Sequence, residues 1–109
     1  MAKSGFILLN KPKGISTFKL LYPIKRFFKG HKVGHAGTLD PDAHGLVIAA
    51  VGKATRLISF LEAEDKVYTF TLHVGVETDS YDAEGEITKR YDNAAVTNQQ
   101  VQNTFAPFL

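Results

Sequence analysis

The sequence GHAGTLDPDAHG (residues 34–45) concentrates groups that could perform chemistry. It holds two aspartates, two histidines and three glycines in twelve positions, and it follows a basic run, KRFFKGHK (residues 25–32). Three kinds of site fit these residue types. They are a metal site, a phosphate-binding loop, and a carboxylate nucleophile held near a polyanion.

A metal site would draw on imidazole and carboxylate ligands within one segment. The spacing matches no metal-binding pattern on a helix face, and the adjacent lysines and arginine would oppose a bound cation. The chain also lacks cysteine, which excludes disulfides and thiolate ligands. We therefore expect no metal at these candidate ligands, which are His31, His35, Asp40, Asp42 and His44.

A phosphate-binding loop would use Gly34, Gly37 and Thr38, because glycines let backbone N–H groups approach an anion. The nucleotide-binding pattern GxxxxGK[ST] is absent, however. Asp40 and Asp42 would also repel a phosphate held close by. The glycines alone therefore support a nucleotide site only weakly.

A nucleophilic carboxylate is the third interpretation. Asp40 lies between Leu39 and Pro41, in a stretch whose glycines and proline can hold one unusual backbone path. An aspartate that bonds its own backbone in a turn fits the same residues and is the commoner arrangement. The loop by itself leaves both interpretations open.

Three further positions have a functional and an ordinary interpretation. Tyr68 fits a base-stacking platform, but an aromatic packed across strands is more common. Asp82, with Asp79, could bind calcium or cap a turn, and the EF-hand order of ligands is absent. Lys11, beside Pro12, is either a phosphate contact or a solvated side chain.

The elements that must position these residues follow from periodicity and from turn residues. Apolar runs and period-two alternation predict strands, and apolar residues at helical spacing predict helices. Ser16 and Thr97 are suited to cap the first and last helices. The predicted strands are 6–9, 46–51, 66–76 and 86–88, the predicted helices are 17–29, 54–63 and 97–105, and residues 33–45 are predicted to form a loop.

Charge is divided unevenly along the chain. Residues 1–56 carry ten Lys/Arg and two Asp, a net +8, whereas residues 57–109 carry three Lys/Arg and nine Asp/Glu, a net −6. A positive half of this kind suits a polyanion partner, although an ordinary solvated surface fits it too. No apolar run approaches the length of a membrane span and no signal peptide is evident, so we expect a soluble, cytoplasmic protein without membrane contact.

Three segments, in order, resemble the TruB family of tRNA pseudouridine synthases. They are GFILLNKPKGIST, KVGHAGTLDPDAHGLVIAAVGKATRL and DKVYTFTLHVGVETDSYDAEGEI, which together run from Gly5 to about Ile87. The resemblance implies an α+β fold with a mixed, mostly antiparallel sheet and flanking helices. It also implies tRNA, through its T-arm, as partner, and no cofactor or metal.

Site residues follow from the same resemblance. Asp40 matches the aspartate that starts cleavage of the uridine N-glycosidic bond, His35 the histidine that enters the RNA stem, and Tyr68 the tyrosine that stacks on the flipped base. Asp82 matches an acidic residue near the active site, and Lys11 belongs to a motif that supports the catalytic loop. The residues we expect to contribute to substrate binding are His35, Tyr68, Asp82, Gly37, Thr38, Lys11 and Arg56.

Family members are more than twice as long, so the resemblance implies that residues 1–109 are the N-terminal part of a catalytic domain. The apolar C-terminal end (Val101, Phe105, Phe108 and Leu109) is expected to be covered by the missing half or by another chain. The expected activity is conversion of a T-stem-loop uridine, position 55, to pseudouridine, with little activity from the isolated chain. The alternatives are an RNA-binding module or RNA chaperone without catalysis, and a guide-RNA-dependent synthase subunit.

Overall fold

The computed structural model describes residues 3–92 and 95–109. It divides the chain into two compact units, Met1–Lys66 and Val67–Leu109, although the sequence shows no linker at this point. No helix in the described ranges is long and apolar enough to cross a membrane. Each unit is described by itself below.

The first unit is built on a three-stranded antiparallel sheet, with strand order β1-β3-β2. The strands are β1 (Gly5–Lys11), β2 (Val33–Ala36) and β3 (Gly45–Val51). The β-branched run of β3 suits its central place, where Val47, Ala49, Ala50 and Val51 are buried. Lys11 pairs with Gly45 at one end of this sheet, so the turn after β1 and the loop between β2 and β3 leave the sheet at the same end.

The helix predicted over residues 17–29 is two helices, α1 (Thr17–Leu20) and α2 (Tyr22–Phe27). Pro23 explains the correction, because it has no N–H to continue the hydrogen bonds of α1 and it suits the first turn of a new helix. The predicted cap is confirmed. Ser16 Oγ accepts a hydrogen bond from Lys19 N at 3.1 Å.

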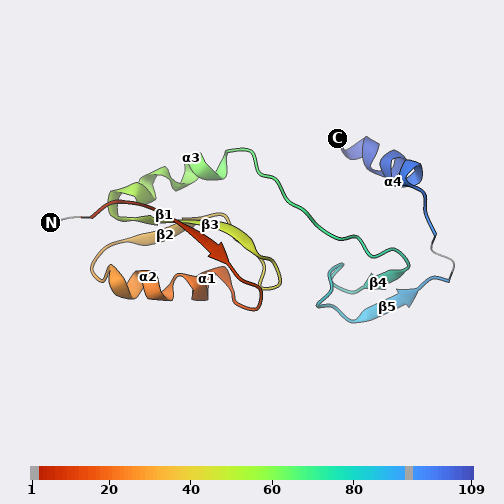
Figure 1. Ribbon diagram of the computed structural model, residues 1–109, viewed down its shortest axis with the longest axis horizontal. Helices are drawn as coiled ribbons and strands as arrows, with labels where there is room; N and C mark the ends of the chain where they lie inside the picture. The colour runs from red at the N-terminus through yellow and green to blue at the C-terminus, as the bar shows by residue number, and fades with distance from the viewer. Residues whose placement is uncertain (1–2, 93–94) are drawn as a thin grey trace. The chain divides into compact units, whose positions relative to one another are not determined.

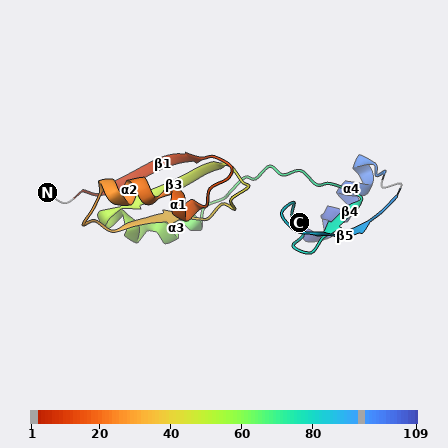
Figure 2. The same cartoon turned by 90° about the horizontal axis from the view of Figure 1, so that it is seen from below.

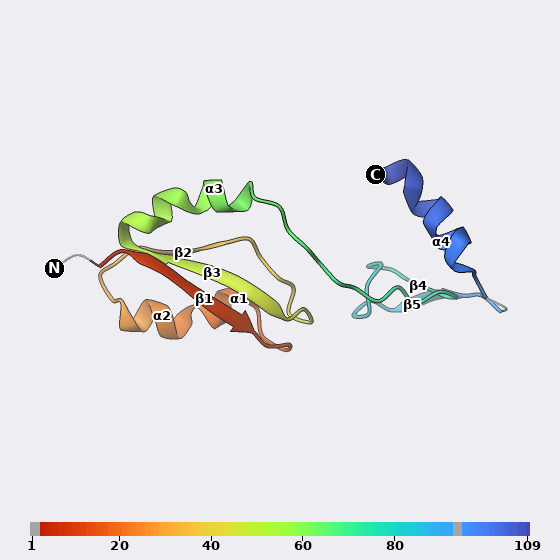
Figure 3. The same ribbon diagram turned by 45° about the horizontal axis from the view of Figure 1, so that its top comes forward.

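Helices lie along both faces of this sheet (Figures 1 and 3). The helices α1 and α2 cover one face, and the other carries the 3₁₀ helix η1 (Gly52–Leu57) followed by α3 (Ile58–Glu62). A side-chain Cβ at Gly34 would lie 2.8 Å from Ile58 Cδ1, so α3 packs closely on β2. The buried apolar core consists of Leu21, Val47, Ala49, Ala50, Val51 and Ala54.

Two predictions about strands are corrected. Residues 33–36, predicted as part of a loop, form β2, whose four residues pair with Ala49 and its neighbours in β3. The strand has only four residues, and Gly34 and His35 among them give no strand pattern. It is defined by its pairing with β3, which the local sequence does not show. The loop itself is confined to residues 37–44.

The strand predicted over residues 66–76 is wrong for all but its last residue. Strand β4 is Val76–Thr78, paired with β5 (Ile87–Arg90), and the residues before it run without strand pairing (Figure 2). An alternating pattern forms a strand only when a partner covers one face. In this chain Val67 is 95% exposed and Phe70 is 70% exposed.

The second unit ends in α4 (Asn98–Phe105) and a short 3₁₀ helix, η2 (Ala106–Phe108). The predicted cap is confirmed, since Thr97 and Gln100 form a reciprocal capping box. Phe108 and Leu109 are exposed at the end of this helix. With two antiparallel sheets and helices outside them, the α+β fold class is confirmed.

Candidate active site

Asp40 lies exposed on the loop between β2 and β3. Its backbone makes a turn, in which the carbonyl oxygen of Asp40 accepts from Ala43 N at 2.9 Å. Among the described residues its carboxylate takes part in no hydrogen bond or ion pair, so the carboxylate does not cap its own turn. The structure therefore presents an accessible, unpartnered carboxylate at the end of the sheet.

The residue after Asp40 is held by hydrogen bonds from the β1–α1 turn. The carbonyl oxygen of Pro41 accepts from Lys11 Nζ at 3.1 Å and from Gly14 N at 2.8 Å. A bond to an ammonium is stronger than one between neutral groups. The C-terminal side of Asp40 is thus joined to the end of β1.

Lys11 is completely buried, which is rare for a lysine. Besides Pro41, its ammonium donates to the carbonyl oxygens of Pro12 at 2.9 Å and Ile15 at 2.8 Å. The three N–H donors of the ammonium thus each have an acceptor. The structure places Lys11 beneath the loop, with no exposed surface and its ammonium bonded to three backbone carbonyl oxygens.

The residue before Asp40 is held by Thr17, at the start of α1. Thr17 Oγ1 donates to the carbonyl oxygen of Leu39 at 2.9 Å and accepts from Leu39 N at 3.0 Å. Thr17 is 2% exposed. The backbone on both sides of Asp40 is therefore fixed to buried side chains of the β1–α1 region.

His35 is half-buried at the third position of β2. Its Nδ1 lies 2.5 Å from the carbonyl oxygen of Gly37. A carbonyl oxygen can only accept, so Nδ1 carries the proton in this hydrogen bond. Gly37 N donates to Glu62 Oε1 at 3.4 Å, and Thr38 is exposed.

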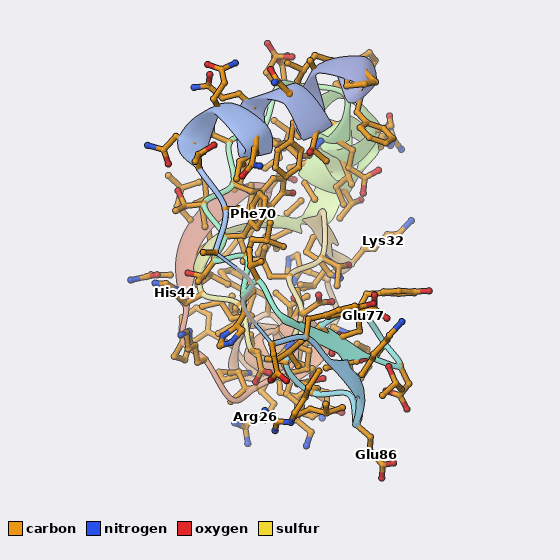
Figure 4. The ribbon with its side chains drawn as sticks, turned by 90° about the vertical axis from the view of Figure 1, so that its right-hand side faces the viewer. Arg26, Lys32, His44, Phe70, Glu77 and Glu86 are labelled. Atoms are coloured by element: carbon orange, nitrogen blue, oxygen red, sulfur yellow. The ribbon has the colours of Figure 1, made fainter. Side chains whose placement is uncertain are left out.

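Arg56 is exposed on η1 and lines a hollow of about 360 Å³ at the opposite end of β3. Residues from the N-terminal segment, from the turn before β2 and from η1 surround it. Lys32 extends away from the ribbon (Figure 4). The side chains that give this basic hollow its positive charge are Lys3, Lys32, Lys53 and Arg56.

In the second unit, Asp82 belongs to the loop between β4 and β5. Its Oδ1 accepts from Ser80 Oγ at 2.6 Å, from Glu84 N at 3.0 Å and from Gly85 N at 3.2 Å. The Ser80 hydroxyl first, and then these backbone amides, lower the pKa of Asp82 below its ordinary value. This carboxylate caps its own turn, in contrast to that of Asp40.

Tyr68 also belongs to the second unit, on the irregular segment before β4, and it is 65% exposed. The first unit alone therefore brings together five of the predicted site residues around one loop: Asp40, Lys11, His35, Gly37 and Thr38. Among residues 3–92 and 95–109, no three His, Asp or Glu side chains are grouped so as to hold a metal ion.

Thr17 is the residue around this loop that the sequence does not single out. The available signal was the pair Ser16-Thr17 at a helix start, where one hydroxyl is enough to cap the helix. The basic hollow was likewise visible only as the positive charge of residues 1–56. Its lining comes from segments far apart in the chain, which periodicity cannot bring together.

One known protein family matches most of this chain. The family described as "TruB family pseudouridylate synthase (N terminal domain)" matches residues 25–109. The matched range contains His35, Asp40, Tyr68 and Asp82.

Relatives named tRNA pseudouridine synthase B match most of the chain. The protein of Fusobacterium nucleatum is 52% identical over 82 residues, covering 75% of this chain and 29% of the relative. That of Dehalococcoides mccartyi is 43% identical over 104 residues (95% and 35%), and that of Mesoplasma florum is 41% identical over 108 residues (99% and 38%). The chain thus spans about a third of the length of these relatives.

Proposed function

This chain belongs to the TruB family of pseudouridylate synthases, and on that premise we propose that it supplies the catalytic aspartate of a tRNA pseudouridine synthase. The proposed substrate is the uridine at position 55, in the T-stem loop of tRNA. The observation that carries the proposal is the exposed, unpartnered carboxylate of Asp40 on a backbone fixed at Leu39 and Pro41.

In the proposed reaction, Asp40 starts cleavage of the bond between N1 of the uracil and C1′ of the ribose. The base then turns, and C5 forms the new bond to C1′. The hydrogen on C5 leaves to solvent and N1 gains a proton, so the product is an isomer of the reactant. A fixed carboxylate suits this chemistry, because a nucleophile works best when its position is set before the substrate arrives.

The base must leave the RNA stack before Asp40 can reach its ribose. Unstacking costs a few kcal/mol. Two groups can offset that cost: an aromatic side chain that stacks on the flipped base, and a side chain that fills the space the base leaves in the RNA. We propose that His35 fills the space that the base leaves. The hydrogen bond from its Nδ1 to the carbonyl oxygen of Gly37 orients the ring. We assign the aromatic face to Tyr68, which is exposed and available for stacking.

The basic hollow supports an RNA substrate. Phosphate contacts from lysine and arginine supply affinity and set the register of an RNA without recognising its sequence. Arg56 lies at this hollow with three lysines, at the end of β3 away from Asp40. The relatives' names support tRNA as the RNA, and we propose that the protein acts on it in the cytoplasm.

We propose that turnover also requires residues equivalent to the two thirds of the relatives that this chain does not span. The test measures tritium release from T-arm RNA that carries 5-tritiated uridine. It compares this chain alone with a chimera in which the chain replaces the 108 matched residues of the Mesoplasma florum relative. The chimera should release tritium and its Asp40→Asn form should not. An Asp40→Asn chimera as active as its parent would overturn the assignment.

RNA binding without catalysis is the second candidate, and the basic hollow is the observation that favours it. It predicts salt-sensitive binding of T-arm RNA and no tritium release from a folded chimera. Filter binding at several salt concentrations, run beside the tritium assay, distinguishes the two candidates.

A further inference from the structure

We infer that Thr17 is a positioning residue for Asp40, acting through the backbone of Leu39. The inference rests on the proposed function and adds to it a residue that neither the motifs nor the family match assigns. Its starting point is the pair of hydrogen bonds between Thr17 Oγ1 and both backbone groups of Leu39.

The chemistry of the hydroxyl explains why the position suits threonine. A hydroxyl donates one hydrogen bond and accepts another at the same atom, which neither a carboxylate nor an ammonium can do. Here it satisfies the N–H and the carbonyl oxygen of one residue, at 3.0 and 2.9 Å. Leu39 lies on a loop with no strand partner at this position, so these bonds take the place of a sheet ladder.

Burial makes this bridge rigid. Thr17 is 2% exposed, and a β-branched side chain has few χ1 rotamers. Ser16 caps α1 by accepting from Lys19 N, so the cap does not compete for the Thr17 hydroxyl. The two adjacent hydroxyls therefore have separate tasks, one within the helix and one across to the loop.

The position of Asp40 depends on this bridge and on the bonds to Pro41, because the carboxylate has no hydrogen-bond or ion-pair partner among the described residues. No described side chain holds the carboxylate itself, so its location follows from the backbone on either side. Lys11 and Gly14 hold the following residue through Pro41, and Thr17 holds the preceding one. A displacement of about 1 Å in a reacting group can lower a rate by about 100-fold.

The test uses the chimera with the Mesoplasma florum relative, with Thr17→Val and Thr17→Ser as the variants. Valine keeps the shape and removes both hydrogen bonds, whereas serine keeps the hydroxyl. We expect Thr17→Val to lower kcat by about 10- to 100-fold with KM within about threefold, and Thr17→Ser to keep kcat within about threefold. Thr88→Val, on the exposed strand β5, is the matched control and should leave both constants unchanged.

Amide hydrogen exchange supplies a readout that does not depend on turnover. In Thr17→Val the Leu39 amide should exchange faster while Val47, in the buried core, stays protected. Full kcat in Thr17→Val, or a Thr17→Ser enzyme as slow as Thr17→Val, would overturn the inference. An inactive parent chimera, or an active Asp40→Asn form, would instead overturn the proposed function.

Discussion

The ammonium of Lys11 donates to the carbonyl oxygen of Pro41 across 3.1 Å, joining the end of β1 to the loop that carries Asp40. Thirty residues separate the two in the sequence. This bond, with the Thr17–Leu39 pair on the other side, fixes the backbone of the loop while leaving the Asp40 carboxylate exposed. The following predictions test that arrangement and the surfaces around it.

Replacing Lys11 with methionine should destabilise the first unit by about 2–4 kcal/mol. The change keeps an unbranched buried side chain but leaves three carbonyl oxygens without their donor. The measurement is urea denaturation followed by circular dichroism. Lys13→Met, at an exposed position two residues away, is the control and should stay within about 0.5 kcal/mol of wild type. Equal stability of the two variants would contradict the buried role of Lys11.

Gly52→Ala should lower the free energy of unfolding by about 1–3 kcal/mol. Gly52 has φ +65°, and an added Cβ would meet the carbonyl oxygen of Lys3. The matched change is Gly5→Ala, where a Cβ meets no atom within 4 Å. Thermal unfolding of both variants checks the difference, and a Tm for Gly52→Ala equal to that of Gly5→Ala would contradict the close approach of Lys3.

Removing the Ser80 hydroxyl should raise the pKa of Asp82 toward its ordinary value of 3.8. The pKa of Asp82 is lower in the folded state than its ordinary value. The Asp82 turn therefore stabilises the fold when the pH is above that ordinary value, and this stabilisation is lost as the pH falls through the lowered pKa. Carboxyl ¹³C titration by NMR, comparing wild type with Ser80→Ala, measures the change. Ser59→Ala, on α3, should leave the Asp82 titration where it is. An identical Asp82 titration in wild type and Ser80→Ala would exclude the hydroxyl as the main cause.

Removing positive charge from the basic hollow should lower the affinity for RNA and make that affinity less dependent on salt. Lys53→Gln with Arg56→Gln removes two cations, and we expect about a 10- to 100-fold loss of T-arm RNA affinity at low salt and a shallower dependence on salt. The matched pair, Lys89→Gln with Arg90→Gln, lies on β5 and should change affinity by less than about threefold. An equal loss in both pairs would indicate a general charge effect.

The elements that the sequence predicts well are those with strong local signals. The buried run of β3 and the caps Ser16 and Thr97 depend on residues close together in the chain. The strand expected over residues 66–76 depended on a partner outside that window, and alternation cannot supply one. The single helix predicted over residues 17–29 was wrong at Pro23, although the missing N–H of Pro23 is a local signal for the break between α1 and α2.

The candidate site divides in the same way. Asp40 and Lys11 could be identified because the sequence motifs that contain them resemble those of a known family. Thr17 lies in the same segment as Lys11, but the resemblance gives it no role, and its contact with Leu39 is seen only in the structure. The exposed carboxylate of Asp40 also needed the structure, since the loop sequence alone favours an aspartate that caps its own turn.

The most direct test of the central claim measures pseudouridine formation by the chimera in three forms: wild type, Asp40→Asn and Asp42→Asn. Asp42 is also exposed on the loop, two residues from Asp40, and it controls for the loss of one negative charge. We predict tritium release by the wild-type and Asp42→Asn forms, and a loss of at least about 1,000-fold in Asp40→Asn, as expected for removal of a nucleophile. Tritium release by Asp40→Asn at the wild-type rate would contradict the claim that Asp40 starts the reaction.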